Sequence, residues 1–126
     1  MTFPETLREL ARLRPEKFRI LQRTSLGGLE EFAIMDAGER GNILDSWILK
    51  DTVFYQDDID SILAELGWEY QLFPRVKEGK ATEWGFIVWE LGKAPLRVTG
   101  EWFKDKGKAA QAALTAVVEE IKKGEK

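Results

Sequence analysis

The fold is decided by the stretch 68–121, which reads WEYQLFPRVKEGKATEWGFIVWELGKAPLRVTGEWFKDKGKAAQAALTAVVEEI. It contains three runs rich in aromatic and β-branched residues, at 68–76, 82–91 and 96–103. These residue types favour strands, and the connections between the runs are short and contain glycine. The pattern therefore predicts a three-stranded antiparallel meander.

The middle strand of this meander is apolar on both faces. Alternation along a strand points one set of side chains to one face and the next set to the other. Such a strand is expected to be covered on both sides or to expose a binding surface. The two sets are Trp84, Phe86 and Val88 on one face, and Ile87, Trp89 and Leu91 on the other.

An alanine-rich helix is predicted at 106–122, after the meander. Its apolar stripe is built largely of small residues, which let the helix backbone approach a sheet whose bulk comes from tryptophan. We expect Trp84, Phe86 and Leu114 to be buried where sheet and helix meet. The stripe consists of Ala110, Ala113, Leu114, Val117 and Ile121.

The N-terminal part begins with a helix predicted at 3–14. Thr2 and Glu5 have the spacing of a capping box, and Pro4 suits a first helical turn. Amphipathic spacing of leucines supports the same assignment.

Two strand-like runs follow, at 18–24 and 29–35, and the Gly-Gly loop between them predicts a hairpin. Residues 43–55 are ambiguous: their first part has apolar spacing that suits a helix, and their last part has β-branched and aromatic residues that suit a strand. Both alternatives stay open at this point.

The clearest helical spacing in the chain runs from 59 to 66, with apolar residues at i, i+3, i+4 and i+7. Asp57 or Asp58 is expected to cap its start, and Gly67 is expected to close its end. The elements together predict one α+β domain spanning 1–126. Its antiparallel sheet combines the hairpin with the meander, and helices cover it on both faces.

Composition excludes several classes of protein. The chain has 126 residues, no cysteine and no histidine, so disulfides, thiolate metal sites, Cys–His or Ser–His–Asp catalysis and zinc hydrolysis are excluded. No apolar run approaches the roughly 18 residues of a membrane span, and the start lacks the blocks of a signal peptide. We therefore expect a cytoplasmic protein. The many charged residues and the single asparagine are typical of a protein from a thermophilic source.

The segment 60–122 resembles a known kind of small domain. The residues that carry the resemblance are Gly67-Trp68, Trp84 and Trp89 on paired strands, Trp102, and the helical run AAQAAL at 109–114. They are similar to the small phage-type ABA-sandwich domains, in which helical layers cover both faces of a sheet and an alanine-rich helix ends the chain. The resemblance covers about half of the chain. It implies a phage or prophage accessory protein and brings no catalytic residues.

Charge is distributed unevenly, although the net charge is only −3. Residues 26–70 carry two basic and eleven acidic side chains, a net charge of −9. An acidic region attracts a basic surface, and aromatic residues anchor interfaces. The opposing interpretation is a solvated acidic surface without a partner. The candidate protein-binding residues are Asp45, Trp47, Asp51, Tyr55, Asp57 and Asp58.

A basic N-terminal region is the second candidate surface, because basic side chains contact the phosphates of nucleic acids. The opposing interpretation is a solvated, self-compensated face, since Glu5–Arg8 and Glu9–Arg12 have the i, i+3 spacing of helical ion pairs. The candidate nucleic-acid-binding residues are Arg8, Arg12, Lys17, Arg19 and Arg23.

Asp57, Asp58 and Asp60 form the densest acidic cluster in the chain. Carboxylates suit Mg²⁺, but capping and the helix dipole account for acidic residues at a helix start. We therefore expect no metal, no cofactor and no catalytic residue. The sequence favours a small non-catalytic protein-interaction or regulatory module, phage-derived as the resemblance implies, that binds a basic surface of a partner macromolecule. The alternatives are a nucleic-acid-binding accessory protein and, third, a carboxylate- or metal-dependent enzyme.

Overall fold

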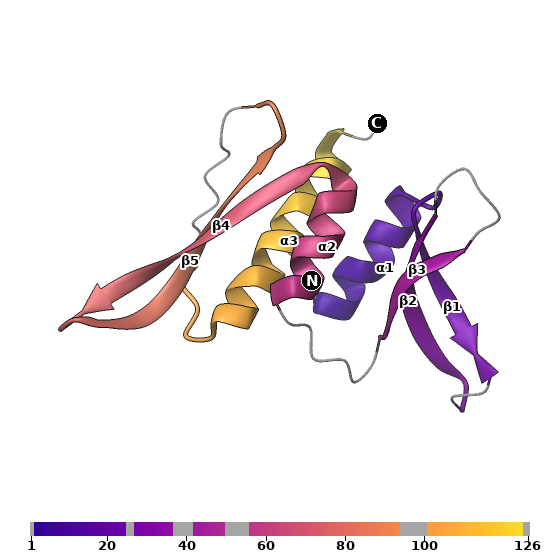
Figure 1. Ribbon diagram of the computed structural model, residues 1–126, viewed down its shortest axis with the longest axis horizontal. Coiled ribbons are helices and arrows are strands. Elements are labelled where there is room, and N and C mark those ends of the chain that lie inside the picture. Colours follow the sequence, from indigo (N-terminus) through magenta and orange to yellow (C-terminus); the bar gives the residue numbers. More distant parts are fainter. Residues whose placement is uncertain (1, 25–26, 37–41, 50–55, 94–100, 125–126) are drawn as a thin grey trace. The chain divides into compact units, whose positions relative to one another are not determined.

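The computed structural model describes residues 2–24, 27–36, 42–49, 56–93 and 101–124, and the chain forms two compact units, Met1–Val53 and Phe54–Gly124 (Figure 1). The described part consists of three helices, a three-stranded sheet and a two-stranded sheet, with antiparallel pairing throughout. The predicted α+β class is therefore confirmed. The interpretation of 1–126 as one domain stays a prediction.

Helix α1, Phe3–Leu13, opens the first unit. The Oγ1 of Thr2 accepts the N–H of Glu5, and the carboxylate of Glu5 accepts the N–H of Thr2, each at 3.3 Å. This is the capping box that the spacing predicts, and Pro4 lies in the first turn as expected. The helix buries Thr6, Leu7, Leu10 and Leu13.

Strands β1 (Phe18–Arg23), β2 (Leu29–Met35) and β3 (Ile43–Ile48) form an antiparallel sheet in that order. The predicted hairpin of the first two strands is confirmed. The ambiguous segment 43–55 begins as a strand, because β3 pairs with the second edge of β2; residues 50–55 lie outside the described part.

Three aromatic rings stack across this sheet, one from each strand. The ring centroids of Phe18 and Phe32 are 5.6 Å apart, and those of Phe32 and Trp47 are 6.3 Å apart. Phe18 and Phe32 are almost fully buried, and such pairs contribute beyond the area that they bury. The stack is therefore the centre of the first unit's sheet.

Helix α2, Gln56–Leu66, opens the second unit. Because the helix begins at Gln56, Asp57 and Asp58 lie inside its first turn, and the prediction that one of them is the N-cap is wrong. The end of the helix is as predicted. Gly67 has a φ of +76° and donates its N–H to the carbonyl of Ala64 at 3.1 Å, and this left-handed conformation favours glycine.

Strands β4 (Trp68–Lys77) and β5 (Lys80–Glu90) form a long antiparallel hairpin. Glu78 and Gly79 join them, both with positive φ, as a type I′ turn requires. The third strand predicted at 96–103 falls largely on residues outside the described part. One bridge is described at its end: the N–H of Trp84 donates to the carbonyl of Phe103 at 2.6 Å, and the N–H of Phe103 donates back at 2.9 Å.

Helix α3, Lys106–Gly124, completes the second unit and buries its small-residue stripe against the hairpin and α2 (Figure 1). Phe86 and Leu114 are buried, as predicted. Trp84 is only half-buried, contrary to the prediction; the ammonium of Lys106, an exposed residue, lies over its ring, 4.9 Å from the centroid.

The strands form two sheets rather than the single expected sheet of hairpin plus meander. The reason is the chain order: β3 occupies the second edge of β2, and α2 then separates β3 from β4. Covering by helices on both faces is not found in the described part of the second unit. There α2 and α3 contact each other and pack on the hairpin face that carries Phe86 and Val88 (Figure 1).

Candidate functional site

The predicted protein-binding residues are distributed over both units. Asp45 and Trp47 lie on the same face of β3, since they are two residues apart, and Asp45 is exposed whereas Trp47 is half-buried against Phe32. Asp57 and Asp58 lie in the first turn of α2, with side chains outside the described part. Asp51 and Tyr55 also lie outside it. Within each unit the described backbone places one pair of these residues close together, Asp45 with Trp47 on β3 and Asp57 with Asp58 on α2.

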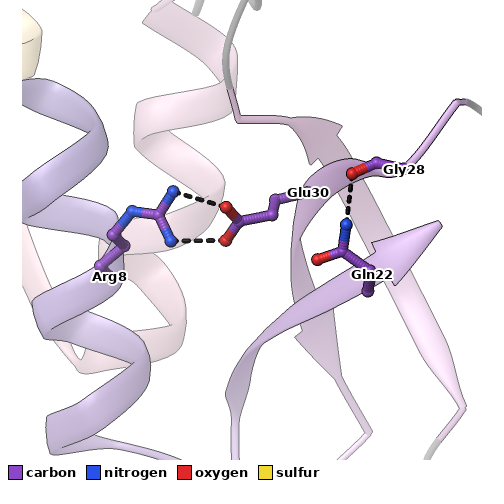
Figure 2. A network of polar contacts seen from close by, with 4 residues as sticks. All are labelled: Arg8, Gln22, Gly28 and Glu30. Atoms are coloured by element: carbon purple, nitrogen blue, oxygen red, sulfur yellow. Dashed lines mark hydrogen bonds and ion pairs between the residues drawn. The ribbon is translucent and has the colours of Figure 1, made fainter.

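Among the predicted nucleic-acid-binding residues, Arg8 makes the strongest contact with another element. Its guanidinium on α1 donates two hydrogen bonds to the carboxylate of Glu30 on β2, at 2.5 and 2.9 Å (Figure 2). The expected partner was Glu5, but Glu5 is engaged in the capping box, so Arg8 reaches the sheet instead. Alternation along β2 places Glu30 on the same face as Phe32, and α1 therefore lies over the aromatic stack.

The hydrogen bond from Arg8 holds the pKa of Glu30 below its ordinary value, and the same bond raises the pKa of Arg8. The two side chains are partly exposed, so salt and water screen the pair. Nearby, the side-chain amide of Gln22 on β1 donates to the carbonyl of Gly28, just before β2 (Figure 2). This network links the helix, the sheet and the hairpin loop.

The structure describes the other basic candidates as follows. Arg12 donates to the carboxylate of Glu9 at 2.5 and 3.0 Å, which confirms the predicted i, i+3 pair. The carbonyl of Lys17 accepts the N–H of Met35 at 2.7 Å. Arg19 is exposed and donates to the carbonyl of Pro15 at 3.4 Å. Arg23 ends β1, with its side chain outside the described part.

No group of three or more carboxylates in the described residues is arranged to hold a metal ion. The side chains of Asp57 and Asp58 lie outside that set, and Asp60 is exposed on α2. The first unit contains a groove of about 370 Å³ beside the Arg8–Glu30 pair. It is lined by Pro4, Arg8, Gly28, Leu29, Glu30 and Leu49.

The outer face of the β4–β5 hairpin, which the helices do not cover, carries an aromatic cluster. The rings of Phe73 and Trp102 meet edge to face at a centroid distance of 5.4 Å. They converge over Gly85, where a Cβ would lie 3.0 Å from Phe73 and 3.1 Å from Trp102. The guanidinium of Arg75 lies 4.1 Å from the centre of the Trp102 ring and pairs with Glu83 at 3.6 Å. Aromatic rings therefore supply the packing that glycine lacks in this strand.

A larger groove of about 670 Å³ follows β4 within the second unit. Its floor is the first half of β4, from Trp68 to Leu72. One wall comes from α2 and the other from the outer face of the hairpin, so the groove combines apolar side chains with both signs of charge. It is lined by Asp60, Leu63, Ala64, Trp68, Glu69, Tyr70, Gln71, Leu72, Trp89, Leu91 and Lys106.

This groove is the best candidate for a binding site, and the sequence prediction missed it. Trp89 and Leu91 belong to the face for which a binding surface was considered, and Leu91 is 55% exposed. From the sequence, Asp60 is a candidate Mg²⁺ ligand or part of a helix start, and neither interpretation predicts a groove. The missing information was that β4 lies at the edge of its sheet next to α2, which no local pattern reveals.

Comparison of the chain with protein-family models, with curated proteins and with solved structures gives no match. The resemblance of 60–122 to phage-type ABA-sandwich domains therefore stays a prediction. No helix in the described residues is both long enough and apolar enough to cross a membrane.

Proposed function

We propose that the protein is a small non-catalytic protein-interaction module, of a regulatory or phage-accessory kind, that binds a basic surface of a partner protein. The observation that carries the proposal is the groove beside β4, which has aromatic rings at Trp68 on its floor and Trp89 on one wall, and acidic groups at Asp60 and Glu69. Aromatic residues supply much of the energy of protein interfaces, and charges around them set the association rate.

The charge of the surrounding chain supports this choice. Residues 54–70, which belong to the second unit, carry five acidic and no basic side chains, and Asp57 and Asp58 lie in the first turn of the helix that carries Asp60. A basic partner would be drawn to this side of the unit at low salt.

Charge reversal tests the proposal. After a partner has been isolated with the unmodified protein, its association rate is measured with the double variant Asp60→Lys/Glu69→Lys. We expect the rate at low salt to fall at least tenfold and the difference to shrink at high salt. Glu119→Lys, on the exposed side of α3, is the matched control and should keep the original rate. An equal rate for the double variant and the unmodified protein would reject the groove as the contact site.

Nucleic-acid binding is the less favoured alternative, because Arg8 and Arg12 each hold a carboxylate of the protein itself. Salt-sensitive binding of a generic oligonucleotide by the unmodified protein, lost in Arg19→Glu, would favour this alternative instead.

A further inference from the structure

The contacts of β5 determine which way the backbone N–H and C=O groups of β4 point at the floor of the groove. Trp84 uses both its N–H and its C=O with Phe103, on the side of β5 that faces away from β4. Trp84 is opposite Pro74 in the register, so this is a pair without hydrogen bonds between β4 and β5. The backbone groups of Pro74 therefore point away from β5.

The other end of the hairpin gives the same alternation. The N–H of Leu91 donates to the carbonyl of Gly67 at 3.0 Å. The backbone of Gly67, an odd-numbered residue directly before β4, is therefore turned towards β5. The intervening pairs keep one register from Trp68 to Arg75. Trp68 and Leu72 must then direct their N–H and C=O groups to the edge of β4 that β5 does not occupy, as Pro74 directs its C=O.

The groove and this edge coincide. The residues of β4 that line the groove run from Trp68 to Leu72, and β5 is the one strand that pairs with β4 in the described part of the chain. Pro74, the next residue whose backbone is turned to this edge, has no N–H to donate, as is typical of edge strands. The stretch available for pairing is thus short and ends where the groove ends.

The side chains around the edge indicate what kind of segment fits. Apolar groups of Leu63 and Ala64 on one side and Trp89 on the other suit alternating apolar residues. The carboxylates of Asp60 and Glu69 favour basic residues, although Lys106 at one side opposes them. In an extended segment the side chains alternate between two faces, so its apolar residues fit against Leu63 and Ala64 on the α2 side while its basic residues face Glu69 on the outer side.

We infer that the groove takes an extended segment of a partner protein, with alternating apolar and basic side chains, which adds to the edge of β4 as a further strand. The inference rests on the proposed function and specifies how the partner is held. Backbone hydrogen bonds supply affinity in this mode, and the groove supplies the choice of side chains.

The first test uses a synthetic peptide, acetyl-Lys-Val-Lys-Val-Lys-Val-Lys-amide, with the whole chain. We expect binding by calorimetry and at least tenfold slower hydrogen exchange at the amides of Trp68 and Leu72. The amides of Glu69 and Gln71 already face β5 and should change little. The control peptide has the same side chains but every backbone amide N-methylated, which removes its donors, and it should not bind.

The second test blocks the groove. Ala64→Arg fills it and repels the peptide, whereas Ala81→Arg places the same side chain at an exposed position near the hairpin tip. We expect the first variant to lower peptide affinity at least tenfold and the second to keep it. Circular dichroism of both variants checks that they fold.

The outcomes separate the two proposals. Equal binding of the methylated peptide, slowed exchange confined to α2, concentration-dependent pairing of the chain with itself at this edge, or no peptide binding at millimolar concentration would each overturn strand addition. If the charge reversal at Asp60 and Glu69 still lowers partner association in that case, the proposed function stands without strand addition. If neither the peptide nor the charge reversal has an effect, both fail.

Discussion

The two sheets of this protein are stabilised in different ways. In the three-stranded sheet, aromatic rings stack from strand to strand and the Arg8–Glu30 pair connects the helix to β2. In the two-stranded sheet, one face depends on α2 and α3, and the other on Trp102 and Phe73 over Gly85. An isolated hairpin is at best marginally stable, so β4 and β5 need these additions. The comparison teaches that the larger groove follows the sheet with fewer strands, along the edge of β4 that has no partner strand in the described part of the chain.

The largest expected effect comes from the stack in the first sheet. Phe32→Ala should lower the free energy of unfolding of the first unit by about 3–5 kcal/mol, because the ring is fully buried between Phe18 and Trp47. Denaturant unfolding followed through amide signals of each unit measures it. Leu44→Ala, on a side chain that is 56% exposed in the same sheet, is the control. An equal effect of both variants would show that the stack is not central.

A smaller effect is expected in the second sheet from Gly85→Ala. The added Cβ meets two converging rings at 3.0 and 3.1 Å, so they must shift, at a cost of about 1–3 kcal/mol. Gly124→Ala adds the same group in open space and should not destabilise the protein. If Gly85→Ala is as stable as the unmodified protein, the rings of Phe73 and Trp102 can move to accommodate the methyl group without a loss of stability.

Removing the cation above the cluster tests how much the outer face depends on it. Arg75→Gln should cost about 0.5–1 kcal/mol, since cation–π contacts at exposed sites have that strength. Thermal unfolding followed by tryptophan fluorescence measures the change. Lys77→Gln removes the same charge from an exposed position on the same strand and should have a smaller effect. A larger loss of stability in Lys77→Gln than in Arg75→Gln would contradict a stabilising contact between Arg75 and Trp102.

The smallest expected effect is the pH dependence due to Glu30. The bond from Arg8 lowers the pKa of Glu30 in the folded state. The ionised carboxylate therefore stabilises the folded protein at a pH above the pKa that Glu30 has in the unfolded chain. This stabilisation is lost as the pH falls through the lower pKa of the folded protein. Glu30→Gln should therefore flatten the acid side of the stability profile, and Arg8→Gln should do the same. Unchanged profiles in both variants would show that screening cancels the pair.

Local signals in the sequence were sufficient for much of the fold. The capping box of Thr2 and Glu5, the left-handed Gly67 and the turn at Glu78–Gly79 depend on neighbours a few residues apart. Alternation and helical spacing then assign most of the strands and helices to within one or two residues. The physical reason is that capping, turns and amphipathic periodicity are determined by nearby residues.

Contacts between distant residues were not predictable in the same way. Glu30 lies 22 positions from Arg8. The spacing predicts the i, i+3 neighbour Glu5 as the partner, but the carboxylate of Glu5 accepts the N–H of Thr2 instead. Trp102 reaches Gly85 only because Phe103 pairs with Trp84. The groove depends on β4 being an edge strand, which follows from the division into two sheets. Sheet order is a property of the whole chain, and single-sequence patterns contain little of it.

The contacts described in the first unit also bear on how the chain folds during synthesis. They join residues between positions 2 and 49, which are made before the second unit. At about 5–20 residues per second, the rest of the chain takes several seconds to appear. A β-hairpin needs on the order of 1–10 μs to form. We therefore expect the first sheet to close on its helix while the second unit is still being translated, so the order of synthesis becomes the order of folding.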